Sequence, residues 1–136
     1  MNKIIQNAMK TVDGTIITSG SVHDYVEYEG HSVDGGGEYY RYGYPTGCES
    51  KIELLFLNEN DPLEMKKKKL IWGTRGKDGK QPLKWVKLIE CETDHLKAIL
   101  KQVTPHQPHT EVIQSVLEDR SIQMRVKKIK KLKNGI

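Results

Sequence analysis

The chain has 136 residues, of which 36% are hydrophobic and 29% are charged, and its formal net charge is +4. This length fits one domain with its own core, and no apolar run approaches the roughly 20 residues that a membrane-spanning helix needs. Two cysteines, Cys48 and Cys91, are too few for a disulfide scaffold or a zinc site, so we expect free thiols in a reducing compartment.

The charges are distributed unevenly along the chain. Residues 1–60 contain nine acidic and four basic residues, whereas residues 120–136 contain seven basic residues and no acidic one. Such asymmetry indicates an anionic partner, a solvated basic tail, or contact between the basic end and the acidic half of a second copy.

The first half is predicted to be mainly β structure, because short apolar runs alternate with turn residues. The pair Asp13-Gly14 predicts a type I′ hairpin turn, which requires positive φ angles. Glu29-Gly30 marks a second hairpin, and the three glycines at 35–37 are expected to break the ladder that follows. The predicted strands cover residues 4–11, 15–19, 24–28, 31–34, 38–44 and 52–57.

The second half is predicted to be mainly helical. Asp61-Pro62 indicates the start of a short helix that runs to Lys69, since Asp is a common N-cap and Pro is favoured at the first helical position. A strand pair is predicted over 70–74 and 83–88, and a helix capped by Thr93 is predicted over 94–102. A second, longer helix is predicted from about 110 to 132. It follows a turn at Pro105 and Pro108 and ends at Gly135. Strands followed by helices, without a linker or repeat, predict a single α+β domain over 1–136. Residues 1–90 would form mainly an antiparallel β-sheet, and residues 91–136 would add two C-terminal α-helices.

A basic, glycine-rich loop over 75–82 connects the predicted strands 70–74 and 83–88. The most informative segment runs from Trp72, in the first of these strands, to Gln81 in the loop. Glycines allow the backbone to approach a ligand closely, and successive N–H groups in a tight turn can form an anion-binding nest. Arg75 adds a planar guanidinium suited to phosphate, and Trp72 adds an aromatic face for a base. The alternative is a plain hairpin loop with solvated charges, and the spacing of a P-loop is absent.

Other candidate sites are less specific. The lysines of 66–69 and the C-terminal basic run can contact phosphates, although such runs are more often solvated helix faces. The tyrosine-rich stretch around Arg41 can stack bases, or it can form a sheet core or a subunit interface. His23-Asp24 lacks an accompanying nucleophile, and the spacing of His106 and His109 does not suit a metal-binding pair on a helix. We therefore expect a binding protein that is not an enzyme and carries no metal or cofactor.

Three stretches of the chain resemble a family of small phage proteins, the first-described type of Thoeris anti-defence protein. The first is IQNAMKTVDGTII at 5–17, followed by HDYV at 23–26 and VDGG at 33–36. The second is WGTRGKDGKQPLKWV at 72–86, which is the most specific of the three. The third is DHLKAIL at 94–100, followed by VLEDR at 116–120.

This resemblance implies a fold and a function. Family members have an N-terminal antiparallel sheet and two C-terminal helices, and they bind cyclic ADP-ribose isomers without cleaving them. The bacterial Thoeris TIR-domain protein makes such a signal, for example glycocyclic ADP-ribose, and the phage protein sequesters it in the cytoplasm of the infected host. The resemblance also implies a homo-oligomer, a dimer or a hexamer, with pockets near subunit contacts. It implies neither a membrane nor a nucleic-acid partner. Some family members also bind cyclic oligonucleotides at a second site.

A cyclic ADP-ribose isomer carries a pyrophosphate, two riboses and an adenine, which call for cations, hydrogen-bond donors and an aromatic or apolar slot. The ligand-binding residues expected on this basis are Leu70, Trp72, Thr74, Arg75, Lys77, Lys80, Gln81, Lys97, Arg120 and Arg125. His23 and Arg41 are candidates for the second site, although Gly20 and Val22 stand where the family often has arginines.

Two other functions remain open at this point. The cationic end indicates a nucleic-acid-binding phage protein. A protein that inhibits a host defence factor by direct contact is the third hypothesis.

Overall fold

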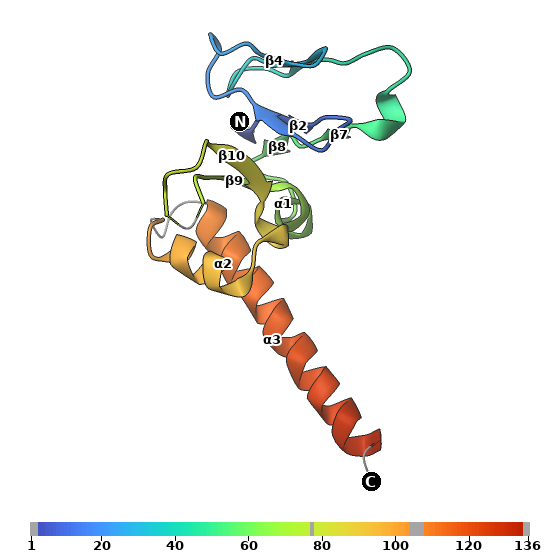
Figure 1. Cartoon of the computed structure of the whole chain (residues 1–136), viewed down its shortest axis with the longest axis vertical. Helices are drawn as coiled ribbons and strands as arrows, with labels where there is room; N and C mark the ends of the chain where they lie inside the picture. Colours follow the sequence, from blue (N-terminus) through green and yellow to red (C-terminus); the bar gives the residue numbers. More distant parts are fainter. Residues whose placement is uncertain (1–2, 77, 104–107, 135–136) are drawn as a thin grey trace.

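The computed structural model describes residues 3–76, 78–103 and 108–134, and it has the α+β fold that the sequence predicts (Figure 1). Short antiparallel strands build the N-terminal part, and the longest of three described helices lies at the C-terminus. Both cysteines are free thiols, as expected. None of the described helices combines the length and the apolar character that crossing a bilayer requires.

The described strands form four small antiparallel sheets, with strand orders β1-β8, β3-β2-β7, β4-β5-β6 and β10-β9. The strands are β1 (Ile4–Gln6), β2 (Ala8–Lys10), β3 (Ile16–Thr18), β4 (Val26–Tyr28), β5 (His31–Asp34), β6 (Arg41–Gly43), β7 (Glu53–Leu54), β8 (Leu57–Asn58), β9 (Ile71–Thr74) and β10 (Lys84–Lys87). The helices are α1 (Leu63–Lys69), α2 (Thr93–Leu100) and α3 (Pro108–Asn134), and the 3-10 turns are η1 (Glu49–Lys51) and η2 (Leu88–Glu90).

Strand β2 lies in the middle layer of the N-terminal part. Successive side chains of a strand point to opposite faces, and both faces of β2 are covered. Met9 packs with Ile17 and Val33 against the β4-β5-β6 sheet, whereas Ala8 packs with Leu55 and Ile71 against the β9–β10 hairpin. Figure 1 shows these layers, with β4 above β2 and β7, and with β9 and β10 below them.

The β9–β10 hairpin separates this middle layer from the largest core. Trp72 and Val86 face one another in the register and pack on the core, while Ile71 and Trp85 point to the opposite face, toward β2. Residues of β8, η2, α2 and the first half of α3 fill this core. Its buried members are Leu57, Leu70, Leu88, Cys91, Leu96, Ile99, Val112, Ile113 and Val116.

Helix α3 has a packed half and a free half. It starts at Pro108, and residues 121–132 are all exposed where the helix projects away from the body (Figure 1). The predicted long helix is thus confirmed. The predicted turn residue Pro105 and the predicted stop at Gly135 lie outside the described residues.

The two shorter helices each start one residue from their predicted positions. Pro62, and not Asp61, is the N-cap of α1, which begins at Leu63. Glu92, and not Thr93, is the N-cap of α2. The carboxylate of Asp61 instead accepts a hydrogen bond from the backbone N–H of Asn58, so it closes the preceding turn and leaves α1 without a side-chain cap.

The predicted strand over 4–11 is divided at Asn7. The part before it pairs with β8, and the part after it pairs with β3 and β7. Asn7 is buried, and its Nδ2 group lies 2.9 to 3.1 Å from three carbonyl oxygens of the 34–39 loop. The predicted strand over 52–57 is divided in the same way, because its two ends pair with different strands.

The first hairpin turn is not the predicted type I′ turn. Its loop covers residues 12–14, and only Gly14 has a positive φ, of 91°. The carboxylate of Asp13 accepts hydrogen bonds from the flanking Thr11 and Thr15, which favours a type I turn followed by a left-handed glycine. Positive φ angles at both turn residues occur instead at Glu29-Gly30, at 47° and 78°.

The side-chain amide of Gln6 connects the N-terminal layers to the helical part. Its Nε2 group donates to the carbonyl oxygens of Leu55 and Lys69 at 2.8 and 2.7 Å, and its Oε1 atom accepts from the N–H of Ile71 at 2.9 Å. These three backbone groups belong to the β7–β8 link, the end of α1 and the start of β9. Because the amide is buried, no water replaces these bonds when it is lost.

We predict that Gln6→Leu lowers the free energy of unfolding by about 2–5 kcal/mol, since three buried backbone groups lose their partner. Urea denaturation followed by circular dichroism measures this loss. The exposed Gln114→Leu on α3 is the control and should change stability by less than about 0.5 kcal/mol. Equal effects of the two substitutions would contradict the role assigned to Gln6.

Candidate functional site

A groove of about 900 Å³ lies between the β9–β10 hairpin and helix α2. Residues at alternate positions of the hairpin point to one face of it, so they form one continuous wall. This wall consists of Trp72, Thr74, Lys84 and Val86, which pair as Trp72 with Val86 and Thr74 with Lys84. The hairpin therefore presents an aromatic ring, a hydroxyl and an ammonium group in a fixed order.

Helix α2 provides the opposite wall. His95 and Ala98 are three residues apart on its groove-facing side, and Gln102 lines the groove from the turn that follows the helix. The floor is apolar, because Ile99 and the thiol of Cys91 belong to the core beneath. Burial raises the pKa of the Cys91 thiol, so the floor carries no thiolate.

Trp72 is held in place from behind by His109 at the start of α3. The two rings meet edge to face with centroids 5.6 Å apart, and Nε2–H of His109 donates to the carbonyl oxygen of Ile71 at 3.0 Å. Burial lowers the pKa of His109, so the ring is neutral near pH 7 and donates this hydrogen bond without charge. The tryptophan ring is thus fixed before any ligand arrives.

The groove carries both signs of charge. Arg75 and Lys84 line the hairpin side, whereas Glu90, Glu92 and Asp94 line the η2–α2 side. Asp94 lies in the first turn of α2, where a carboxylate is stabilised by the helix dipole. A ligand that fits this distribution carries anionic groups at one end and hydrogen-bond donors at the other.

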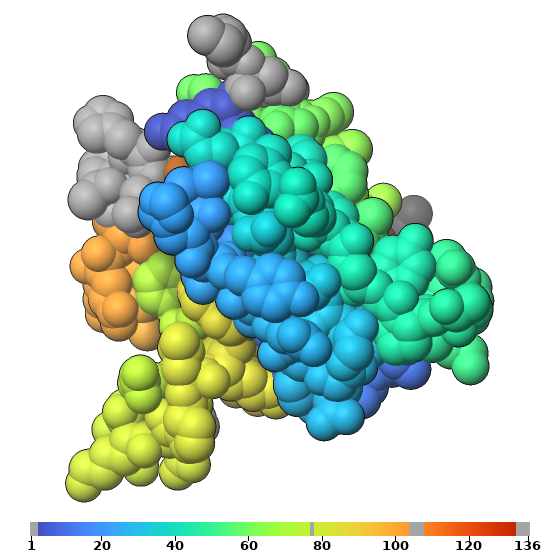
Figure 2. Space-filling view, turned by 90° about the horizontal axis from the view of Figure 1, so that it is seen from above, coloured from blue at the N-terminus to red at the C-terminus, as the bar shows by residue number. Residues whose placement is uncertain are grey.

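The tip of the hairpin is a closed loop that projects from the body (Figure 2, yellow). Four of its described amides donate hydrogen bonds within the loop itself. Gly76 N–H donates to Thr74, Gly79 N–H to Gly76, Lys80 N–H to Asp78, and Gln81 N–H to Arg75. The predicted nest of free N–H groups is therefore not present at these four positions. The cationic groups that the hairpin presents to the groove are the side chains of Arg75 and Lys84.

Two of the expected ligand-binding residues serve the fold instead. Leu70 is 1% exposed in the main core and cannot line a base. The guanidinium of Arg120 donates to the Thr93 hydroxyl and to the carbonyl oxygens of Ile89 and Cys91, at 2.8 to 3.1 Å. Arg120 therefore holds the η2–α2 turn that carries the acidic wall, and it does not face a ligand.

The remaining expected residues are divided between the groove and the outer surface. Trp72, Thr74 and Arg75 line the groove together. Among the described residues, those expected at the site but exposed outside the groove are Lys80, Gln81, Lys97 and Arg125. Lys77 lies outside the described residues.

The two residues expected at a second site lie on the N-terminal layers. His23 is exposed, and Arg41 lies 5.5 Å above the ring of Tyr39 and 3.9 Å from Asp34. Neither residue lines the groove or the second hollow described next.

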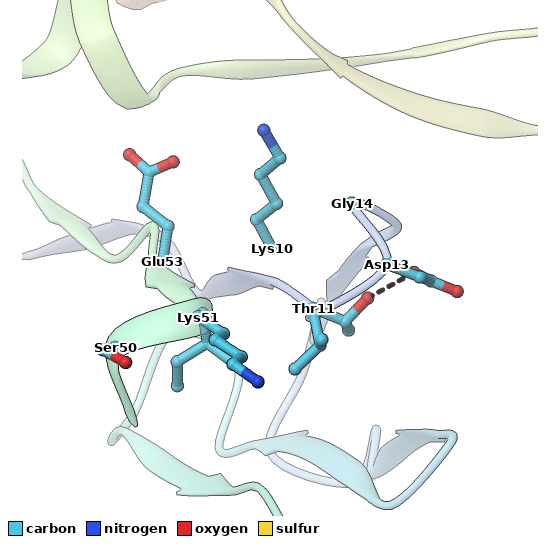
Figure 3. Close-up of a pocket in the computed structure, with 9 residues that line it drawn as sticks. Lys10, Thr11, Asp13, Gly14, Ser50, Lys51 and Glu53 are labelled. Atoms are coloured by element: carbon cyan, nitrogen blue, oxygen red, sulfur yellow. Dashed lines mark hydrogen bonds between the residues drawn. The ribbon is translucent and has the colours of Figure 1, made fainter. Parts of the chain in front are cut away.

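A second, smaller hollow of about 430 Å³ lies between the first hairpin turn and η1 (Figure 3). Lys10 and Lys51 line it, but their side chains extend in different directions. Glu53 on the same rim is paired with Lys87 at 2.6 Å. Because its cations do not converge, this hollow is a poorer anion site than the groove.

Sequence reasoning missed Lys84 and the α2 wall. The hairpin register gives the signal for Lys84, because it lies opposite Thr74. His95 lies in α2, and Gln102 lies in the turn after the helix. The sequence does not indicate that both residues face the β9–β10 hairpin. In the described part of the chain, no three His, Cys, Asp or Glu residues gather closely enough to hold a metal ion.

Comparisons of this chain with protein-family models, with curated proteins and with solved structures found no match. The functional proposal therefore rests on the groove and on the resemblance of the sequence motifs.

We predict that His109 makes the stability of the protein fall below pH 6.5. The folded-state pKa lies below the unfolded value, so the unfolded chain takes up the proton first and gains stability as the pH falls. The contribution is present in full well above pH 6.5 and is lost progressively as the pH falls through 6.5 toward the lower folded-state pKa. His109→Gln keeps an N–H donor without titrating, so denaturation curves at pH 7.5 and 5.5 should differ less for this variant. An equal pH dependence in both proteins would contradict the role of His109.

Proposed function

We propose that this protein binds a cyclic ADP-ribose isomer, such as glycocyclic ADP-ribose, and sequesters it intact as an anti-defence protein of a phage. The proposal joins the motif resemblance to one structural observation. The most specific motif, residues 72–86, forms the aromatic and cationic wall of a groove large enough for a nucleotide.

The groove offers a partner for each chemical part of such a ligand. Trp72 over an apolar floor suits the adenine, and Arg75 with Lys84 suits the pyrophosphate. Carboxylates commonly accept hydrogen bonds from ribose hydroxyls in nucleotide sites, and Glu92 and Asp94 provide such acceptors. We therefore place the phosphates on the hairpin side and the riboses on the α2 side.

Sequestration without cleavage is consistent with the absence of a serine or thiolate nucleophile from the described lining of the groove. Hydrolysis needs a positioned nucleophile and a general acid or base. Among the candidate nucleophiles, Cys91 is buried with a raised pKa, and the described lining holds no serine. The carboxylates of Glu92 and Asp94 are assigned here to the ribose hydroxyls and not to proton transfer. In this proposal the protein acts in the host cytoplasm, by mass action, as a homo-oligomer.

Isothermal titration calorimetry with purified cyclic ADP-ribose isomers tests the proposal. We expect saturable binding and recovery of the unaltered nucleotide after the complex is denatured. The proposal is abandoned if no isomer binds at micromolar protein, or if the recovered nucleotide has been changed.

We predict that Arg75→Ala weakens binding of the cyclic nucleotide by about 1–3 kcal/mol without unfolding the protein, because one charge-assisted contact is lost. Lys97→Ala is the matched control, since Lys97 is an exposed cation outside the groove. Calorimetry on both variants measures the difference. Equal losses would indicate a non-specific charge effect and would remove the hairpin loop from the site.

We predict that Asp94→Asn weakens binding of the cyclic nucleotide several-fold but leaves the affinity for inorganic pyrophosphate unchanged or higher. The expected loss follows from a weaker acceptor for a ribose hydroxyl. Competition titrations with both probes measure this split. A variant that binds the nucleotide more tightly would show that the carboxylate only repels phosphate, and it would reverse the placement of the ligand.

A further inference from the structure

The free half of α3 carries an exposed apolar stripe. Residues 121–132 form about three turns of helix, roughly 18 Å long. Ile122, Val126 and Ile129 are 48%, 45% and 55% exposed, and Leu132 is 66% exposed. Large aliphatic side chains are rarely left in water at this density without a partner.

This stripe is not a continuation of the face that α3 buries in the body. At 100° per residue, Ile122, Val126 and Ile129 share one side of the helix. The core residues Val112, Ile113 and Val116 lie on a side whose centre is about a third of a turn away. The stripe thus faces solvent in a direction that the body does not cover.

The rest of the free half is cationic. Arg125, Lys127, Lys128, Lys130 and Lys131 follow one another with no acidic residue among them. In the described part of the chain none of these five has an ion-pair partner. The last acidic residue of the sequence, Asp119, is already paired with Lys67 of α1.

We propose that the free half of α3 binds an anionic phospholipid surface. An exposed helix with an apolar stripe and surrounding cations lies in the plane of a membrane, with the stripe among the acyl chains and the cations at the headgroups. Each lysine or arginine near an anionic surface adds to the attraction. The helix lies on the bilayer and does not cross it. This inference revises the expectation that the protein has no membrane partner.

The charge pattern selects this partner over two others. A nucleic acid neutralises the cations but leaves Ile122, Val126 and Ile129 in water. A second copy that covers the stripe with its own stripe brings ten like charges of the two tails together, which opposes association. Of these three partners, the anionic surface with an apolar interior is the one that both covers the stripe and neutralises the cations.

The proposal is independent of the nucleotide site. Residues 121–132 line neither the groove nor the smaller hollow. We therefore expect substitutions in residues 121–132 to leave the affinity for the cyclic nucleotide unchanged. If the protein bound no cyclic nucleotide, the membrane proposal would still stand.

Co-sedimentation of the full chain with phosphatidylcholine vesicles, with and without phosphatidylglycerol, tests this proposal. We expect binding only to the vesicles with phosphatidylglycerol, and weaker binding at high salt. The double variant Ile122→Ser/Ile129→Ser should lower the bound fraction about tenfold. Met124→Ser is the matched control, because Met124 is 71% exposed on the other side of the helix and should have little effect.

Three outcomes would overturn the proposal. The first is no binding to vesicles that contain phosphatidylglycerol. The second is a protein that is dimeric by light scattering and becomes monomeric in the double variant, which assigns the stripe to a second copy. The third is salt-dependent binding to duplex DNA or RNA that competes with vesicles and is unaffected by the double variant. Circular dichroism of each variant verifies that α3 remains helical.

Discussion

The buried amide of Gln6 is the interaction on which the arrangement of the two parts depends. It satisfies three backbone groups that are 49 to 65 residues away in sequence, those of Leu55, Lys69 and Ile71, at 2.7 to 2.9 Å. Each of those groups lies where a strand or a helix ends, so regular structure cannot supply its partner. The amide therefore fixes the β9–β10 hairpin against the N-terminal layers, and with it one wall of the groove.

The groove depends in turn on two side chains that face away from it. His109 supports Trp72 from the core side, and Arg120 ties together the η2–α2 turn that carries the acidic residues. Both come from the packed half of α3, so this helix positions both walls at once. The rigidity of the groove is a property of the helix packing and not of the glycine-rich loop.

The two halves of α3 lie in different environments, one packed against the body and the other in solvent. The packed half buries Val112, Ile113 and Val116, whereas residues 121–132 of the free half are all exposed. Its apolar and cationic groups have no partner within the described body. The chain therefore has two separable surfaces, a mixed-charge groove and a basic amphipathic helix.

The sequence by itself determined the fold class, the hairpins and the approximate range of the helices, because apolar periodicity and Gly or Pro positions are local signals. It also indicated that Trp72, Thr74 and Arg75 belong together. Only the tertiary structure decided the roles of Leu70, which is buried in the core, and of Arg120, which hydrogen-bonds the η2–α2 turn. It also decided that the groove carries both signs of charge. Whether a side chain is buried, and which carbonyl groups it contacts, depends on which distant segments of the chain pack together. No local sequence pattern specifies that packing.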